Sequence, residues 1–154
     1  MKVLFIQPRY PDTFWSLRHA LRFISKKAVY PPLGLMTVSA MTPGNWTKKL
    51  VDLNTSFLKD EQIIWADIVF ISAMSVQSES VFEVIKRCRS FHKKMVGGGP
   101  LFTEEPEKFD DVDYLVLNEA DRRIALRRRR FAVGPRHRRA GGVGYKGIGD
   151  AVQP

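Results

Sequence analysis

The sequence predicts an α/β fold in which five parallel strands form one doubly wound sheet. Short apolar runs alternate with segments of helical character along the first 120 of the 154 residues. In the clearest of these runs most positions are apolar, which is typical of strands buried on both faces of a parallel sheet. Right-handed crossovers would bring the carboxyl ends of the strands to one edge, where such sheets bind their ligands.

Five segments have the composition of buried strands. The first, KVLFIQ, is a near-continuous apolar run that ends at Pro8. The others read KKLVDLN, DIVFISAM, KKMVGG and VDYLVLN. The predicted strands are residues 2–7, 48–54, 67–74, 93–98 and 112–118.

Helical patterns occupy the intervals between these runs. Residues 31–41 open with two prolines, which suit the first turn of a helix. Residues 75–94 carry an apolar stripe with the spacing i, i+3, i+4 and i+7, which is expected to face the sheet. The stripe consists of Val81, Val84, Ile85 and Cys88. Shorter helices are expected at residues 60–66 and 104–111.

The net charge of +9 arises almost entirely in the last part of the chain. Lys and Arg number 15 against 14 Asp and Glu through Ala120, and 10 against 2 from Asp121 onward. The sequence therefore divides into a folded domain at residues 1–120 and an Arg- and Gly-rich tail at residues 121–154. The tail is expected to be disordered or out of frame. The alternative is a nucleic-acid-binding arm, although the tail lacks the aromatic residues of a sequence-specific module.

Cys88 is the only cysteine, so a single chain can form neither a disulfide nor a cysteine-ligated cluster. No window offers the roughly 18 apolar residues of a membrane span. The apolar run at the N-terminus is too short for a signal peptide. We therefore expect a cytoplasmic protein without membrane partners.

The connection after the first strand is unusually long. Roughly two dozen residues separate Pro8 from Pro32, where such connections normally need about 2 to 6. The segment is rich in aromatic and basic residues. Two interpretations stay open: a lid or docking surface at the ligand edge, or a helix that packs locally on the sheet.

The loops that follow the strands exclude several classes of ligand. The loop after the first strand reads QPRYPDT and lacks the G-x-G-x-x-G of dinucleotide sites. A G-x-x-x-x-G-K-[ST] phosphate loop does not occur, and the hydroxyl-rich phosphate cradle of a flavodoxin is missing. The strand ends at Gln7-Pro8 and Ser72-Ala73 carry no carboxylate pair for a magnesium ion.

Small residues follow the third and fourth strands. Gly97, Gly98 and Gly99 end the fourth strand, while Ser72 and Ser75 follow the third. Glycines allow another group to approach the backbone closely. The pattern predicts a trough in the sheet edge that admits the tail of a large organic ligand, with one of the two serines as its hydrogen-bond partner.

The same segments, taken in order, resemble a known family. KVLFIQP, PPLGLMTVSAM, DIVFISAMSVQ, VGGGP and YLVLNEA are similar to the N-terminal cobalamin (vitamin B12)-binding domain of cobalamin-dependent radical SAM proteins, over residues 2–120. The resemblance implies a flavodoxin-like (Rossmann-like) fold with a cleft for the nucleotide tail of cobalamin. The residues that it places at the cofactor are Ser72, Met74, Ser75, Gly97, Gly98, Gly99, Pro100, Asn118 and Glu119.

Two motifs of cobalamin enzymes are missing. Without an Asp-x-His-x-x-Gly motif, His19 is interpreted as an ordinary surface or packing histidine, and the resemblance implies base-off cobalamin without a protein histidine ligand. No side chain is expected to ligate a metal. The C-x-x-x-C-x-x-C motif of radical SAM enzymes is also missing, and a single cysteine cannot replace it. The iron–sulfur cluster and S-adenosylmethionine would belong to a catalytic domain that this chain lacks.

The leading interpretation is a cobalamin-binding module, the truncated N-terminal part of a B12-dependent radical SAM enzyme of the methyltransferase type. The chain alone is not expected to be an enzyme, and no catalytic residue is assigned. One alternative is a flavodoxin-like domain for another nucleotide-like ligand. The other is nucleic-acid binding through the basic tail.

Overall fold

The computed structural model describes residues 1–12 and 31–118. Within these two ranges the chain forms one five-stranded, all-parallel sheet with the order β2-β1-β3-β4-β5. The predicted doubly wound, flavodoxin-like sheet is therefore confirmed. The strands are β1 (Lys2–Gln7), β2 (Thr47–Asp52), β3 (Ile68–Ser72), β4 (Lys94–Gly98) and β5 (Tyr114–Val116).

Several sequence predictions concern residues outside these ranges. They include most of the long connection after the first strand, with His19, and the whole basic tail. Glu119, the last predicted cofactor residue, also lies outside the described residues. These predictions stay predictions.

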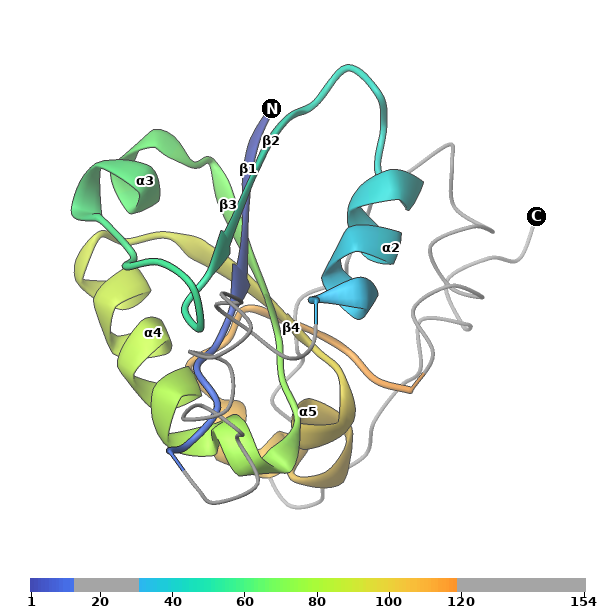
Figure 1. The fold of residues 1–154 in the computed structure, drawn as a ribbon, viewed down its shortest axis with the longest axis vertical. Helices are drawn as coiled ribbons and strands as arrows, with labels where there is room; N and C mark the ends of the chain where they lie inside the picture. Colours follow the sequence, from blue (N-terminus) through green and yellow to red (C-terminus); the bar gives the residue numbers. More distant parts are fainter. Residues whose placement is uncertain (13–30, 119–154) are drawn as a thin grey trace, which may run out of the picture.

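The helices cover the sheet on both sides (Figure 1). Helix α2 (Leu33–Met41) packs on one face, where its Leu35 joins Val3, Phe5 and Phe70 in a core cluster. Helices α3 (Asp60–Trp65), α4 (Ser78–Ser90) and α5 (Pro100–Glu104) contribute to the second cluster, on the opposite face. The predicted stripe on α4 is fully buried there and faces the sheet, as expected.

The central strands β1 and β3 are apolar on both faces because both faces are covered. In β1, Leu4 and Ile6 belong to the cluster under α4, while Val3 and Phe5 belong to the cluster under α2. All four side chains are at most 1% exposed. This two-sided burial explains the absence of an alternating polar pattern in the sequence.

The segment after β4 differs from the expectation. A short helix was expected at residues 104–111, whereas the structure forms α5 directly after the glycines and then the 3-10 helix η3 (Pro106–Phe109). Pro100 takes the first position of α5, where its fixed φ fits and its missing N–H costs nothing. Another 3-10 helix, η2 (Ser75–Gln77), precedes α4, so the helix expected over 75–94 begins in 3-10 form and ends at Ser90.

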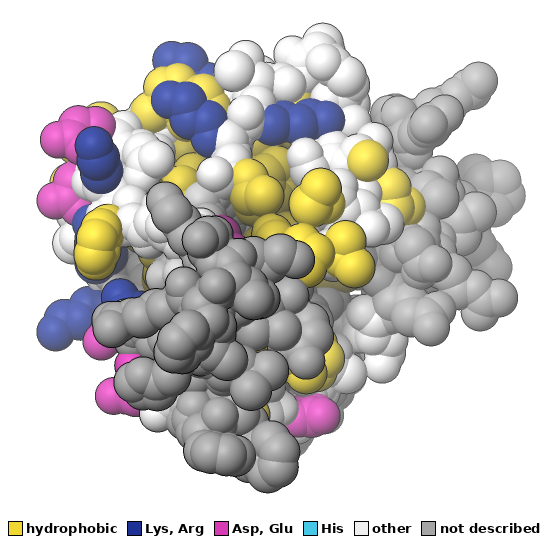
Figure 2. All heavy atoms as spheres, in the orientation of Figure 1, with side chains coloured by type: hydrophobic (Ala, Val, Ile, Leu, Met, Phe, Trp, Pro, Cys, Tyr) yellow, Lys and Arg dark blue, Asp and Glu magenta, His cyan; other side chains and the backbone are white. Residues whose placement is uncertain are grey.

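Helix α2 carries apolar side chains on its exposed side as well as on the side that packs against the sheet. It contains no charged residue, and Leu35 is its one fully buried side chain. Leu33 and Met36 are 64% and 50% exposed. Hydrophobic side chains accordingly gather on the surface over and beside α2 (Figure 2). The described part of the chain contains no helix with the length and hydropathy that a membrane crossing requires.

Candidate functional site

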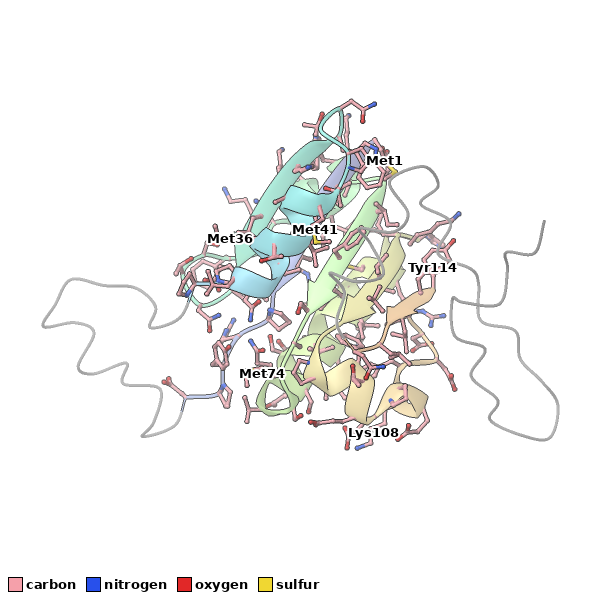
Figure 3. All side chains as sticks on the ribbon, turned by 90° about the vertical axis from the view of Figure 1, so that its right-hand side faces the viewer. Met1, Met36, Met41, Met74, Lys108 and Tyr114 are labelled. Atoms are coloured by element: carbon pink, nitrogen blue, oxygen red, sulfur yellow. The ribbon has the colours of Figure 1, made fainter. Side chains whose placement is uncertain are left out.

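Ser72 and Gly98 are neighbours at the carboxyl edge of the sheet. They end β3 and β4 and are register partners in the ladder between these strands. In Figure 3, Met1 lies at the amino end of the sheet and Met74 at its carboxyl end. The strand exits, which are the points where the chain leaves each strand, lie at the Met74 end. The serine and glycine segments therefore lie side by side, as the sequence predicted.

Gly97 is explained by packing inside the protein. A β-carbon added there would lie 2.6 Å from the ring of Phe102 and 3.0 Å from a methyl group of Leu115. Phe102 belongs to α5 and is fully buried. The missing side chain at Gly97 thus allows α5 to pack against β4, and that face of the strand is filled.

Gly98 faces the opposite side of the sheet, because side chains alternate along a strand. Among the described residues, an added β-carbon would meet only Val116, at 3.5 and 3.7 Å, which is ordinary contact. Val116 belongs to the core cluster on the α2 side. Gly98 is therefore the glycine that leaves space on the face that α2 covers.

Gly99 turns the chain from β4 into α5. Its φ of 93° lies in the region that favours glycine. An added β-carbon would lie 2.9 Å from the carbonyl oxygen of Ala73 and from the hydroxyl of Ser72. The backbone of β4 thus passes close to the exit of β3, and a larger residue would push the two exits apart.

The hydroxyl of Ser72 lies between Gly99 and helix α2. The β-carbon position of Gly34, in the first turn of α2, is 3.9 Å from Ser72 Oγ. Ser72 is partly buried, and no residue of the described ranges accepts or donates a hydrogen bond at this hydroxyl. On the α2 side of the strand exits, Ser72 contributes a hydroxyl without a partner among the described residues, and Gly34 and Gly98 contribute two positions without side chains.

Met74 and Ser75 follow on the rim of the edge, and both are exposed. The thioether sulfur of Met74 accepts a hydrogen bond from the hydroxyl of Tyr10, with 3.6 Å between the two atoms. The hydroxyl of Ser75 donates to the carboxylate of Glu104. Ser75 is therefore engaged within the protein, whereas the hydroxyl of Ser72 has no hydrogen-bond partner among the described residues.

Pro100 and Asn118 lie at the carboxyl edge of the sheet, where their backbone conformations shape the chain after β4 and β5. Pro100 is exposed at the start of α5. Asn118 has a φ of 62°, and its N–H donates to Thr103 Oγ1 over 3.0 Å. The Thr103 hydroxyl in turn donates to the carbonyl oxygen of Gly99 over 3.1 Å. The exit of β5 is thus tied to the glycine turn.

Sequence reasoning missed Gly34 and Gln77. Gly34 sits in an apolar helix pattern that gave no reason to relate it to Ser72. The side chain of Gln77 is only 1% exposed and hydrogen-bonds at the exits of β1 and β3. Gln77 could have been recognised in the sequence as an uncharged polar residue between a predicted strand and the amphipathic helix that follows it.

Thiol chemistry is not available at this edge. Burial raises the pKa of Cys88 from 9.0 to about 12, although the positive charges of Arg87 and Lys93 lower it in part. The thiol is fully buried under α4 and belongs to the core cluster there. Over residues 1–12 and 31–118, no three His, Cys, Asp or Glu side chains gather as a metal site.

Comparison with known proteins gives two curated relatives. The chain is 37% identical over 128 residues to the protein named uncharacterized methyltransferase sll1242 of Synechocystis sp. (strain ATCC 27184 / PCC 6803 / Kazusa), a match that covers 82% of this chain and 24% of the relative. It is 29% identical over 119 residues to the hopanoid C-2 methylase of Rhodopseudomonas palustris (strain TIE-1), covering 77% of this chain and 23% of the relative.

Both names describe methyl transfer. The chain is thus related to proteins named as methyltransferases, and it spans about a quarter of the length of each relative. No family model matches the chain, and no solved structure matches it.

Proposed function

We propose that residues 1–120 form a cobalamin-binding module of a longer, methyltransferase-like protein of the B12-dependent radical SAM type. The observation that carries this proposal is the pairing of Ser72 with Gly98 at the carboxyl edge, with both residues on the side that α2 covers. Carboxyl edges of parallel sheets are where ligands of this fold class bind. The two relatives named for methyl transfer support the type of enzyme.

The residues at the edge fit the nucleotide tail of cobalamin. Gly98 and Gly34 carry no side chain where the tail would lie against the α2 face. The Ser72 hydroxyl, which has no partner among the described residues, would hydrogen-bond with the tail. Gly97 does not line this space, because Phe102 fills its side of β4. The exposed Leu33 and Met36 of α2 offer apolar surface for the flat ring systems of this otherwise polar ligand.

The described residues that would hold cobalamin are Ser72, Met74, Gly98, Gly99, Pro100 and Asn118, with Ser75 bound to Glu104 on the rim. Glu119 is proposed from the sequence alone. Cobalamin, when bound, would supply a cobalt centre that accepts and gives up a methyl group. The proposed form is base-off, without a histidine of this chain on the metal.

The role of this chain is to bind and orient the cofactor. The iron–sulfur cluster and S-adenosylmethionine would be bound by a radical SAM catalytic domain, which would also select the substrate.

The test is retention of hydroxocobalamin. Purified protein is mixed with excess hydroxocobalamin and desalted, and its visible absorption spectrum is recorded. We expect about one corrin per chain to be retained. A desalted protein without corrin absorbance overturns the proposal, provided that circular dichroism shows it to be folded.

A further inference from the structure

Gln77 is a buried amide at the junction of two strand exits. The described residues contain three buried polar side chains, which are Gln7, Thr42 and Gln77. Thr42 bonds to the end of α2 through Ser39, whereas Gln7 and Gln77 meet at the carboxyl edge. A buried amide is costly unless its donors and acceptors are satisfied, so its partners show which atoms it holds in place.

The carboxamide of Gln77 bonds to the backbone of both exits. Its Oε1 accepts the N–H of Met74 over 2.9 Å, at the turn that follows β3. Its Nε2 donates to the carbonyl oxygen of Pro8 over 2.5 Å, directly after β1. A longer contact of 3.5 Å joins its Oε1 to Nε2 of Gln7. One side chain therefore fixes the exit of β1 relative to the exit of β3.

Two further side chains, from other parts of the chain, hydrogen-bond to the backbone at the exit of β1. Asn54, after β2, donates to the same Pro8 oxygen over 3.3 Å and accepts the N–H of Tyr10 over 2.9 Å. Ser80, on α4, accepts the N–H of Arg9 over 2.9 Å. The segment 8–10 is thus held by side chains from three elements, and Gln77 is the fully buried one.

The exit of β3 is likewise held from two sides. Ala73, which separates Ser72 from Met74, donates its N–H to Gly98 and accepts the N–H of Leu101. Gln77 holds the next N–H along the chain, that of Met74. The backbone next to Ser72 is therefore fixed on the β4 side by Ala73 and on the β1 side by Gln77.

We propose that Gln77 is a positioning residue of the candidate ligand site. It acts through the backbone of Met74 and Pro8 and does not itself touch the ligand. This inference rests on the proposed function, because it assigns Gln77 a role in the site that binds cobalamin. Removing its hydrogen bonds loosens the two exits, and the ligand must then order them on binding, which weakens affinity.

The test compares two variants. Gln77→Met keeps the length and volume of the side chain but removes both the donor and the acceptor. Val3→Ala is the control, because Val3 is fully buried at the opposite end of β1 and its truncation lowers stability without touching the edge. Urea unfolding measures the loss of stability in both variants, and all binding is measured where both are folded.

The first measurement is amide hydrogen exchange without ligand. In Gln77→Met we expect exchange at Met74, Arg9 and Tyr10 to be faster by about tenfold or more, while the amides at the start of β1 change little. The control should change exchange only through its global stability. Unchanged exchange at Met74 and Arg9 in Gln77→Met overturns the positioning role, whether or not the protein binds cobalamin.

The second measurement is affinity for hydroxocobalamin. We expect Gln77→Met to bind about tenfold or more weakly than the unmodified protein, and Val3→Ala to bind as the unmodified protein does. Equal affinities of the two variants overturn the inference and leave the proposed function standing. If the unmodified protein retains no hydroxocobalamin, the proposed function fails, and the exchange measurement alone decides whether Gln77 fixes the exits.

Discussion

Ser72 and Gly98 end adjacent parallel strands as register partners, and both face the side of the sheet that α2 covers. The hydroxyl of Ser72 lies close to two glycine positions, Gly34 and Gly99, and bonds to no other residue of the described ranges. This pairing is the reason why the proposal places the ligand at the carboxyl edge of β3 and β4.

Gly97→Ala is expected to destabilise the fold. The new methyl group would lie 2.6 Å from the ring of the fully buried Phe102, so α5 must shift. Overpacking of this kind lowers the free energy of unfolding by about 1–3 kcal/mol. Gly98→Ala is the matched control, because its methyl group makes ordinary contacts and should change stability by less than about 1 kcal/mol. Urea unfolding of both variants checks this; equal losses would contradict the assignment.

Gly98→Leu is expected to abolish retention of hydroxocobalamin without unfolding the protein. The leucine side chain would project into the space on the α2 side that the proposal gives to the nucleotide tail. Gly44→Leu is the control, since a β-carbon at Gly44 meets nothing within 4 Å among the described residues. Absorbance of the desalted complexes measures the effect. Full retention by a folded Gly98→Leu variant would refute the role of this glycine.

Ser72→Ala is expected to weaken hydroxocobalamin binding by about two- to tenfold, the range of one net hydrogen bond. Stability should change by less than about 0.5 kcal/mol, because the hydroxyl has no partner in the described residues to lose. Titration followed by visible absorbance gives the affinity. Ser90→Ala, at the end of α4, should bind normally. A large loss of stability in Ser72→Ala would show that the hydroxyl serves the fold instead.

Cys88 is expected to resist thiol reagents in the folded protein at neutral pH and to react once urea unfolds the chain. Burial raises its pKa to about 12, so the nucleophilic thiolate is scarce as well as inaccessible. The contribution of the raised pKa to the free energy of unfolding is fully present below pH 9.0, the pKa of the exposed thiol. This contribution is lost as the pH rises from there toward 12, because the thiol then ionises in the unfolded chain while it stays protonated in the folded one.

The measurement for Cys88 combines labelling with stability. Iodoacetamide labelling is followed by mass spectrometry with and without urea. The free energy of unfolding of the unmodified protein and of Cys88→Ala is compared between neutral and alkaline pH. Rapid labelling of the folded chain, or the same alkaline loss in both proteins, would contradict the assignment.

The sheet was predictable because strands that are buried on both faces consist mostly of apolar residues, and this composition is visible in the sequence. Five short segments with apolar centres, separated by helical patterns, admit few arrangements other than a parallel, doubly wound sheet. The adjacency of Ser72 and Gly98 followed from the same reasoning, since parallel strands end at one edge. The start of α5 was missed because Pro100 after three glycines also fits a loop.

The sequence by itself determined the fold class and the residue types at the edge where the proposal places the ligand. Only the tertiary structure decided what each small residue does: Gly97 makes room for Phe102, Gly98 stays open toward α2, and Gly34 approaches Ser72. It also decided that Gln77 joins the exits of β1 and β3. The physical reason is that periodicity records which face a residue occupies, whereas its partner across that face depends on how helices far away in the sequence pack.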